Sequence, residues 1–508
     1  MARSFAHRPH RLSLLLVVAL LLSPFRGRAK SSPTLAPDQP FTLEDAISVA
    51  MRSNFDLRIQ AYNIESARET IESAKATFDP TLSATVRRNL SQAAITTSRL
   101  DGTDQVGPRN DNTVINISAD ERLPQTNGTV SISTNLNRNA TNSTNALLNP
   151  SYRNGVTARI SQPLLQNAGR TVATANLERA RLGLSVASLN YRSRILNVIQ
   201  QTENAYYNLV AARETLRIRQ LTHEYNQKLF EEIQVRRATG VATDLDVFSA
   251  EYGVANALRA VVQADQAVRD AEDTLLNLIN TPDLDVRPGP VEFDEYTAGA
   301  PNFAISYKRA RDYFPEALST EETIKQLEIT VAVAKRNQLP ALNLDASLGY
   351  TARTVESGYL DAISNLPSDH GNNWSVGFTY QMPWGRRDAR SDYRAALINL
   401  NSRRLTLEQL EQALLVSVRT AVRAVESNLI AVDIAGKATE LSVKQYELQK
   451  ARFDAGLSTS RLVLQAQDDL ENARNAELNA KLALRRALAE LHRLEGTSIE
   501  RFGVQLPQ

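Results

Sequence analysis

The chain is internally duplicated, and this duplication constrains its fold more than any other feature of the sequence. The segment Ala74–Leu82 recurs as Ala334–Leu342, shifted by 260 positions. The segment Arg236–Thr243 recurs as Arg452–Thr459, shifted by 216 positions. Because the matched segments follow the same order in both halves, we expect each half to form the same supersecondary unit.

Each half is predicted to contain a helix, strands, a long helix, a tight turn and a further helix. A helix of about 68 residues is ~100 Å long, and the two shorter helices laid end to end reach about the same length. One long helix can therefore be matched along its whole length by two short ones. The expected helical spans are 42–77, 170–237 and 243–280 in the first half, and 304–337, 387–453 and 459–494 in the second.

The helix after each turn carries an apolar seam with heptad spacing, which is typical of coiled-coil packing. This seam predicts helical hairpins but no particular function. In the first half it runs through Val247, Ala250, Val254, Ala257, Val261, Ala264, Val268, Ala271, Leu275 and Leu278, and in the second half it runs from Val463 to Leu494 with one interruption at Glu477.

The segments between the helices alternate apolar and polar residues, which is the period of a β-strand. Leu342, Leu344 and Ala346, for example, alternate with polar neighbours. A soluble sheet with one wet face shows the same alternation. Strands of about ten residues behind a signal peptide, with aromatic residues such as Trp374 and Tyr380 at candidate interfacial positions, instead favour a transmembrane β-barrel.

The first thirty residues are typical of a secretory signal peptide. A basic segment with Arg3, Arg8 and Arg11 precedes nine apolar residues, Leu14–Leu22, and small residues follow near Ala29. An uncleaved signal anchor is the alternative. The formal net charge is +2, but residues 1–29 contain five arginines and no acidic residue, so cleavage would leave a slightly acidic chain. That balance does not indicate a nucleic-acid partner.

The residues that catalysis or metal binding would need are scarce. The chain has no cysteine, which excludes disulfides, thiolate metal sites and the lipid-bearing cysteine of a lipoprotein. His223, His370 and His492 lie on different predicted elements, and no phosphate-binding, dinucleotide-binding or nucleophile-elbow motif occurs. Acidic residues such as Glu231 and Glu232 are expected to be solvated. We therefore expect neither an enzyme nor a cofactor.

Several of these features together resemble the TolC family of outer membrane efflux proteins. They are the duplicated strands between long helices, the opening segment Phe41–Ala46, the turns at Gly240 and Gly456, and the strand exits at Pro163 and Pro383. The resemblance implies a homotrimer whose subunits each give four strands to a twelve-stranded barrel and their helices to a periplasmic tunnel. It also implies an outer-membrane exit duct for drug efflux or type I secretion, working with a periplasmic adaptor and an inner-membrane transporter.

The predicted fold is therefore mixed and mainly α, with duplicated coiled-coil hairpins and the antiparallel strands of a trimeric transmembrane barrel. The resemblance covers about residues 41–495. The predicted divisions are a signal peptide (1–29), a first repeat (30–280, strands at about 81–162), a linker (281–303), a second repeat (304–495, strands at about 341–381) and a C-terminal tail (496–508).

The two helical turns are the candidate functional sites. Gly240 and Gly456 stand where a long helix must reverse, which suits a left-handed residue. Thr243 and Thr459 follow three residues later as candidate helix N-caps. The resemblance implies that these tips ring the periplasmic mouth and meet the adaptor.

The resemblance also places an acidic gate residue at Asp246, where a ring of three carboxylates would favour cations. In the best-studied pattern of the family, a tyrosine and an arginine of the second turn hold such a gate shut. Here Phe453 and Ser458 take their places, so that latch is not expected. The candidate substitutes are the arginines Arg237, Arg452 and Arg461.

The first half contains about forty additional residues before Pro163, and they predict an extra β-hairpin. Alternation over 115–120 and 130–136 flanks a short turn, Leu123–Gly128, with an Asn-Gly signal. If the hairpin joins the barrel, each subunit has six strands, a trimer has eighteen, and the turn faces the periplasm. The alternative is a hairpin folded above the membrane.

Two other classes of protein share part of this pattern. A periplasmic coiled-coil adaptor also has helical hairpins, but we find no lipoyl-like domain. A structural surface protein without a pore would need neither one-sided strands nor matched helix lengths. The exported substrate is not determined by the sequence.

Overall fold

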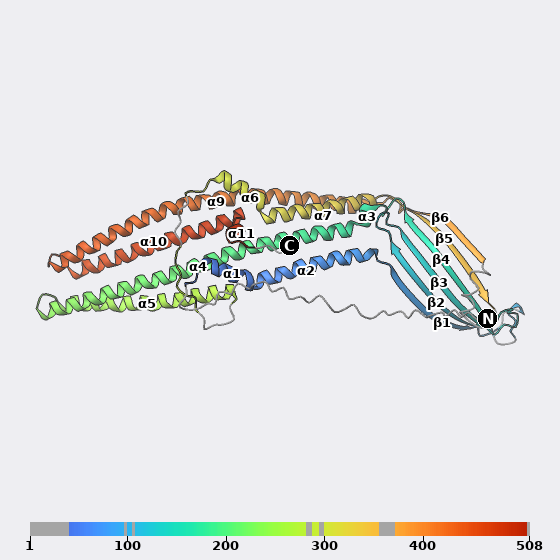
Figure 1. The fold of residues 1–508 in the computed structure, drawn as a ribbon, viewed down its shortest axis with the longest axis horizontal. Helices are drawn as coiled ribbons and strands as arrows, with labels where there is room; N and C mark the ends of the chain where they lie inside the picture. Colours follow the sequence, from blue (N-terminus) through green and yellow to red (C-terminus); the bar gives the residue numbers. More distant parts are fainter. Residues whose placement is uncertain are drawn as a thin grey trace, which may run out of the picture.

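The computed structural model describes residues 40–95, 99–103, 107–280, 287–293, 299–354 and 371–504. The predicted signal peptide and His370 lie outside these residues, as do parts of the predicted linker and of the C-terminal tail. The molecule is elongated, with a long helical part at one end and a sheet at the other (Figure 1).

The same order of elements occurs in both halves. The first half contains α1 (Leu43–Ser53), α2 (Phe55–Lys75), the 3-10 helix η1 (Ala76–Phe78), β1 (Thr81–Gln92), η2 (Arg99–Asp101), β2 (Arg109–Arg122), β3 (Thr129–Thr141), β4 (Ser151–Pro163), α3 (Arg170–Ala173), α4 (Ala175–Ala238) and α5 (Asp244–Ile279). The second half contains α6 (Phe303–Tyr313), α7 (Pro315–Asn337), β5 (Ala341–Thr354), β6 (Gly371–Gln381), α9 (Arg387–Asp454), α10 (Ser460–Glu495) and α11 (Ser498–Arg501).

The first short helix of each half is broken where we expected one continuous helix. Asn54 ends α1 in an extended conformation, and its side-chain oxygen then accepts hydrogen bonds from the backbone of Asp56 (2.9 Å) and Leu57 (3.3 Å), which starts α2. In the second half Phe314 is extended and Pro315 opens α7. The long helix of the first half is likewise interrupted, at Thr174 between α3 and α4. Apolar periodicity continues across such breaks and so did not reveal them.

The six strands form one antiparallel sheet in the order β1-β2-β3-β4-β5-β6. The extra hairpin, β2 and β3, pairs with β1 on one side and with β4 on the other. Its turn lies at the helical end of the sheet, where the Asn127 side chain donates to the carbonyl oxygen of Asn167 (2.6 Å). The hairpin is therefore part of the same sheet as the other four strands, as its predicted place in the barrel requires and as a hairpin folded above the membrane would not be.

The register keeps the predicted alternation aligned across all six strands. Paired residues of an antiparallel sheet share a face. One line of paired residues is apolar and runs through Leu82, Ala119, Ile132, Ala158, Leu348 and Trp374. The next line, on the opposite face, consists of Ser83, Ser118, Ser133, Thr157, Gly349 and Asn373. The sheet therefore has one apolar face and one polar face.

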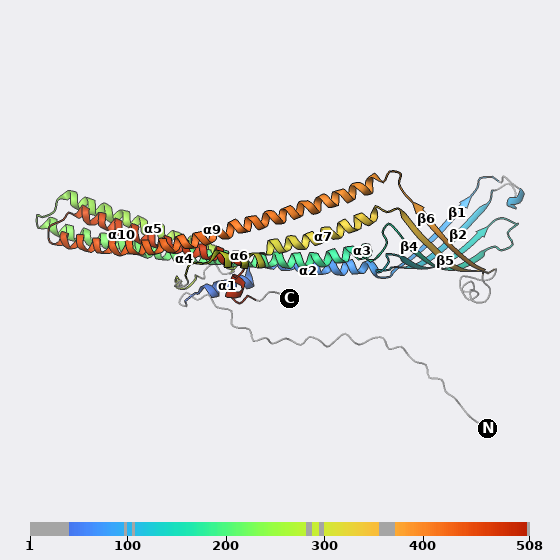
Figure 2. The ribbon, with the colours of Figure 1, turned by 90° about the horizontal axis from the view of Figure 1, so that it is seen from above.

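The helices form a curved layer. Near the turns α4 packs against α5 and α10, and α10 also packs against α9; nearer the sheet, α4 packs between α2 and α7, and α7 packs against α9. Figure 2 shows this layer spreading as it approaches the sheet. The coiled-coil seam is confirmed by the burial of Ala250, Ala257 and Leu275. In the part of the chain that the structure describes, no helix combines the length and apolarity needed to cross a membrane.

Candidate functional site

The two helical turns lie together at the end of the molecule opposite the sheet (Figure 1). Gly240 has φ 77° and Gly456 has φ 71°, so the predicted left-handed conformation is confirmed at both. In the first turn the backbone N–H of Val241 donates to the carbonyl oxygen of Arg236 (2.8 Å). The second turn repeats this bond from Leu457 to Arg452 (2.8 Å), which satisfies the last carbonyls of each long helix.

The N-caps of the two following helices differ. The Thr243 hydroxyl accepts from the backbone N–H of Asp246 (3.2 Å), and the Asp246 carboxylate accepts from the backbone N–H of Thr243 (3.0 Å), which is a capping box. Thr459 also takes the N-cap position, but its side chain makes no capping hydrogen bond. The predicted N-cap position of Thr459 is therefore confirmed, but without a capping hydrogen bond from its side chain. The third residue of its helix is Leu462, which has no carboxylate to complete a capping box.

Asp246 also joins the two hairpins. The Ser460 hydroxyl, which is buried at the start of α10, donates to the second oxygen of the Asp246 carboxylate (2.9 Å). The hydrogen bonds that Thr243 and Ser460 donate hold the pKa of Asp246 below its ordinary value. Both carboxylate oxygens are thus engaged by neighbouring hydroxyl and backbone groups.

The three arginines that we considered as substitute latch residues do not bind this carboxylate. Arg237 pairs with Asp244 instead, at 2.6 Å. Across the described ranges, neither Arg452 nor Arg461 forms an ion pair with Asp246. Ser458 accepts a hydrogen bond from the Gln449 side chain of its own hairpin (2.6 Å).

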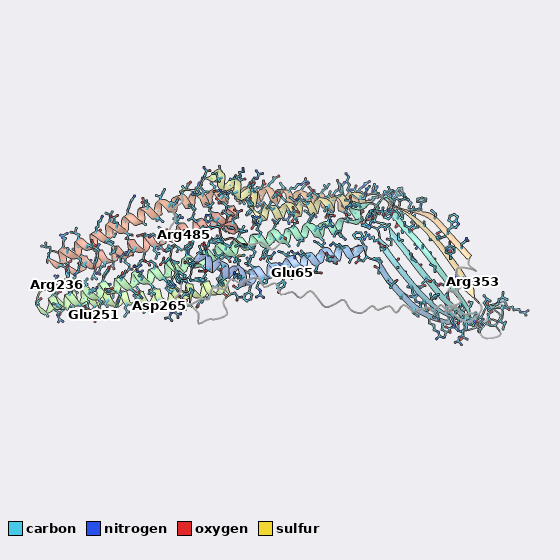
Figure 3. All side chains as sticks on the ribbon, in the orientation of Figure 1. Glu65, Arg236, Glu251, Asp265, Arg353 and Arg485 are labelled. Carbon is cyan, nitrogen blue, oxygen red and sulfur yellow. The ribbon has the colours of Figure 1, made fainter. Side chains whose placement is uncertain are left out.

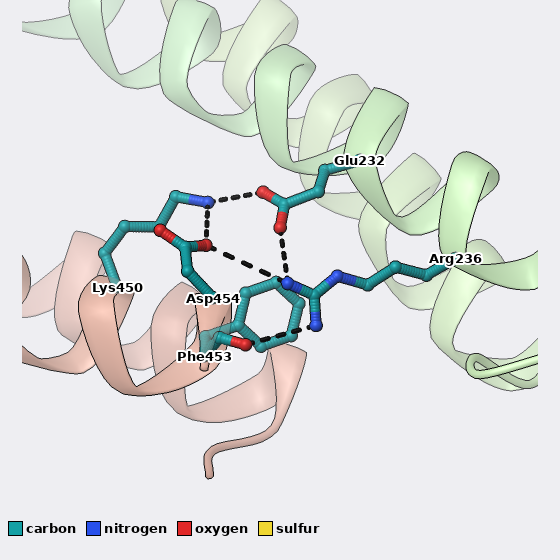
Figure 4. Close-up of polar contacts among 5 residues, drawn as sticks. All are labelled: Glu232, Arg236, Lys450, Phe453 and Asp454. Atoms are coloured by element: carbon teal, nitrogen blue, oxygen red, sulfur yellow. Dashed lines mark hydrogen bonds and ion pairs between the residues drawn. The ribbon is translucent and has the colours of Figure 1, made fainter. Parts of the chain in front are cut away.

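Four charged residues connect the ends of α4 and α9, and we call Glu232, Arg236, Lys450 and Asp454 the tip charge cluster (Figure 4). Arg236 lies 2.7 Å from Glu232 and 3.9 Å from Asp454. Lys450 binds Asp454 at 2.8 Å and also pairs with Glu232. Burial would lower the pKa of Lys450, but its hydrogen bonds to Asp454 and Glu232 outweigh this and raise the pKa above its ordinary value. The cluster thus keeps Lys450 charged beside Glu232 and Asp454.

Phe453 lies beneath this cluster and is only 5% exposed. Its ring packs among Leu229, Ile233, Val247 and Val463, which come from both hairpins. The guanidinium carbon of Arg236 lies 4.1 Å from the ring centroid, and the same guanidinium donates to the Phe453 carbonyl oxygen (3.1 Å). Phe453 therefore joins the two hairpins through buried packing and not through a hydroxyl group.

Sequence reasoning missed the tip charge cluster and Ser460. Glu232 was expected to be solvated, but its side chain is 29% exposed and paired with two cations. Glu231 is exposed and accepts from Gln227 (3.0 Å). The spacing of four residues between Glu232 and Arg236, and between Lys450 and Asp454, was a signal that could have revealed the cluster.

Within the described segments, no three histidine, aspartate or glutamate side chains are grouped closely enough to hold a metal ion. His492 lies near the middle of the molecule, 3.2 Å from the Arg501 guanidinium. Burial, with a smaller contribution from the charge of Arg501, lowers the pKa of His492 to about 4. This imidazole is therefore neutral at neutral pH.

Comparison with known proteins relates this geometry to a family. The profile of the outer membrane efflux protein family matches residues 110–281 and 313–497, once in each half. The pyoverdine export outer membrane protein OpmQ of Pseudomonas aeruginosa is 26% identical over 315 residues, which are 59% of this chain and 61% of OpmQ. The chain thus spans about six tenths of the length of that relative.

Solved structures of outer membrane channels share the fold. The CmeC channel of Campylobacter jejuni superposes with a TM-score of 0.65 at 16% identity, over 92% of this chain and 90% of CmeC. The open state of the Neisseria gonorrhoeae MtrE channel gives a TM-score of 0.60 at 20% identity, over 89% of this chain and 88% of MtrE. Since the family profile matches more than half of the chain, this protein belongs to the outer membrane efflux protein family and is an outer-membrane protein with the fold of these channels.

Proposed function

We propose that this protein is an exit duct and not an enzyme, and that three copies form a channel across the outer membrane and the periplasm. The observation that carries this proposal is a pair of edges, one on each side of the sheet and of the helical layer, that have no partner among the described residues. β1 and β6 are the edge strands of the sheet. In the helical layer the outermost elements are α2 and α5 on one side and α9 on the other. A ring of subunits would join each edge to its counterpart on the next copy.

The sheet supports closure because open edges and unpaired backbone groups are not tolerated in lipid. On the apolar face Leu82 and Val86 of β1 and Trp374 and Phe378 of β6 are exposed in the single subunit. A periplasmic adaptor or a surface protein without a pore would leave this face in water. Three copies of the six-stranded sheet close into an eighteen-stranded barrel, in place of the twelve strands that the family resemblance implies.

The barrel and the helical tunnel would close on similar circles. Eighteen strands ~4.8 Å apart and tilted by ~40° have a perimeter of roughly 110 Å. Four helices of each subunit lie side by side in the layer, and twelve helices ~9 Å apart have about the same perimeter. The extra hairpin thus widens the sheet to the width of the helical layer that it continues.

The helical edges carry apolar side chains on their outer sides. On α9 they recur at intervals of four, seven, eleven and fourteen residues, which keeps them on one side of the helix. These exposed residues are Ile398, Leu405, Val416, Ile430, Ile434, Leu441 and Leu448. On the outer side of α5 the corresponding set is Leu245, Phe248, Tyr252 and Val262.

The duplication indicates how these two edges fit together. Ile218 on α4 and Leu478 on α10 pack together inside the subunit. With the repeat shift of 216, the counterpart of Ile218 is Ile434 on α9 and the counterpart of Leu478 is Val262 on α5. Both counterparts are exposed in the single subunit. We infer that Val262 of one copy packs on Ile434 of the next.

Because the chain has no cysteine, disulfide trapping can test this contact directly. Val262→Cys with Ile434→Cys should give covalent dimers and trimers on non-reducing gels, while the matched pair Ile218→Cys with Leu478→Cys should give only monomers with an internal crosslink. Purified protein should also be trimeric by native mass spectrometry and should conduct in planar bilayers. A monomer without conductance, or crosslinks only within the chain, would contradict the proposal.

The direction of transport follows from the same arrangement. We infer that the helical end extends into the periplasm, where the tips with Gly240, Thr243, Asp246, Phe453, Gly456, Ser458 and Thr459 meet a periplasmic adaptor. Substrates would enter there from an inner-membrane transporter of an efflux pump or type I secretion system and leave through the barrel. Pull-down of the adaptor by the full chain, and its loss when Val241 and Leu457 at the exposed turns are both replaced by aspartate, would test this contact. Undiminished capture by that variant would place the contact elsewhere.

A further inference from the structure

Charged residues are unevenly distributed over the polar face of the sheet. One line of paired residues contains three arginines and crosses five strands, running through Arg87, Val114, Asn137, Arg153 and Arg353. All three arginines are exposed. Arg353 lies toward the end of the sheet that is distant from the helices, and Arg236 lies at the opposite end of the molecule (Figure 3).

Arg153 and Arg353 are direct partners on β4 and β5. Direct partners have Cβ atoms about 5 Å apart, and like charges at such positions are destabilising. Within the ranges that the structure describes, neither residue forms an ion pair with a carboxylate. The adjacent line toward the helices, which runs through Thr85, Asn116, Asn135, Gly155, Thr351 and Gly371, carries no charge at all. The two guanidinium groups therefore repel each other with no compensating carboxylate on the neighbouring line.

Elsewhere the charges of the sheet are close to even, because the strands outside this line carry five arginines and four carboxylates. Nearer the helices Asp120 and Arg159 share one line of the polar face. The next line contains both Arg122 and Asp345. On the apolar face Arg88 pairs with Asp111 at 2.6 Å. The line of Arg87, Arg153 and Arg353 thus holds three of the eight arginines of the strands and none of their four carboxylates.

We propose that this line of arginines is an anion-binding stretch of the barrel lumen, and that the exported substrates carry carboxylate, phosphate or sulfate groups. The proposal rests on the channel function above, in which the polar face lines the lumen. Three subunits would then contribute nine arginines, six of them in opposed pairs. Guanidinium groups bind such oxyanions through two parallel hydrogen bonds, and basic pore linings select for anions. A bound anion between Arg153 and Arg353 would also remove the repulsion between them.

The test is block of single-channel current by tripolyphosphate added to the barrel side of a planar bilayer. Arg153→Gln with Arg353→Gln should weaken block by about a hundredfold or more, since each lost hydrogen bond to a charged group weakens binding by about tenfold or more. The matched control is Arg138→Gln. Arg138 pairs with Tyr152, next to Arg153 in the chain, and so lies at the same level on the apolar face. This control should be blocked as strongly as the wild type.

The outcomes separate the two proposals. A trimer that conducts but is blocked equally in all three proteins, or not blocked at all, would overturn the anion-binding stretch and leave the channel intact. A protein that forms no pore would contradict the channel function itself. If the double variant loses its trimers, the test uses Arg353→Gln alone, which should weaken block by about tenfold or more if the stretch binds anions. Unchanged block in that single variant would also overturn the proposal.

Discussion

The two helical turns arise from the same repeat, yet they have become complementary instead of identical. The first hairpin supplies Glu232 and Asp246, while the equivalent positions of the second hairpin are Leu448 and Leu462. The second hairpin supplies Lys450 and Asp454, and the equivalent positions of the first are Gln234 and Ala238. Backbone geometry at the glycines is retained in both turns.

This difference between the hairpins indicates that the contacts around the tip differ between the inside of a subunit and the edges that face a neighbouring subunit. Inside a subunit the hairpins are joined by the tip charge cluster, by Phe453 and by the Asp246–Ser460 hydrogen bond. The edges available to a neighbouring subunit instead present apolar residues such as Phe248 and Leu441. We therefore expect the two hairpins of one subunit to move together, and the tip to open between subunits.

The largest expected effect comes from removing the buried ring between the hairpins. Phe453→Ala should destabilise the packing of the tip by about 3 kcal/mol, as is usual when a buried aromatic side chain is truncated. Amide hydrogen exchange in the last turns of α4 and α9 should accelerate, with little change in α7. Phe453→Leu is the control and should retain most of the protection. Equal protection in Phe453→Ala and the wild type would show that the ring does not join the hairpins.

Arg236→Ala should have the next largest effect, because it leaves Glu232 and Asp454 with only Lys450 between them. We expect a loss of about 1–3 kcal/mol at the tip and a higher open probability in planar bilayers. The equivalent residue of the second repeat, Arg452, is exposed, and Arg452→Ala should leave both quantities near the wild type. The same effect from both replacements would mean that the hairpins are equivalent after all.

The two N-caps provide a finer comparison. Thr243→Ala should lower the stability of the start of α5 by about 1 kcal/mol, because the capping box is lost. Thr459→Ala should cost much less, since the Thr459 side chain makes no capping hydrogen bond. Hydrogen exchange at the first turns of α5 and α10 measures both. A larger loss at α10 would contradict the difference between the turns.

Asp246→Ala should remove the same cap and also the link to Ser460. Combined with Ser460→Ala in a double-mutant cycle, it should show a coupling energy of about 0.5–1.5 kcal/mol. Current recordings of both single variants would show whether this link holds the channel closed. A coupling near zero would show that the two residues act independently.

A further difference is expected in acid sensitivity. The pKa of His492 is lowered to about 4 in the folded protein, from an ordinary value of 6.5. Between pH 6.5 and pH 4 the unfolded chain therefore binds a proton at His492 that the folded chain does not bind. Packing around His492 should weaken as the pH falls from 6.5 toward 4. Asp246 has a lowered carboxyl pKa, so its stabilising contribution is complete above the ordinary value of 3.8 and is lost only below it.

Hydrogen exchange at pH 7 and pH 5 checks this order. At pH 5 we expect lower protection factors than at pH 7 in the last turns of α10 near His492 and unchanged protection factors at the tip, where a protection factor corrects for the slower intrinsic exchange at low pH. His492→Gln should abolish the acid effect in α10, because the titrating group is absent. Earlier loosening at the tip than around His492 would reverse the expected order.

Several features of this protein were determined by the sequence itself. The duplication, the heptad seam, the left-handed glycines and the alternation of the extra hairpin are local or periodic patterns, and the structure retains each of them. The helix breaks at Asn54 and Phe314 were not predicted, because the apolar pattern continues across them. The roles of the tip residues in gating and adaptor contact stay predictions.

Other features were decided only by the tertiary structure. Ser460 and Arg236, which contact Asp246 and Phe453, lie in the opposite hairpin more than two hundred residues away, and nothing local to Asp246 or Phe453 indicates which side chain of that hairpin will reach it. The opposition of Arg153 and Arg353 depends on the register between β4 and β5, where the two halves of the chain meet. A shift of that register by one residue would move every side chain of a strand to the other face, so the pairing of whole faces determines which charges meet.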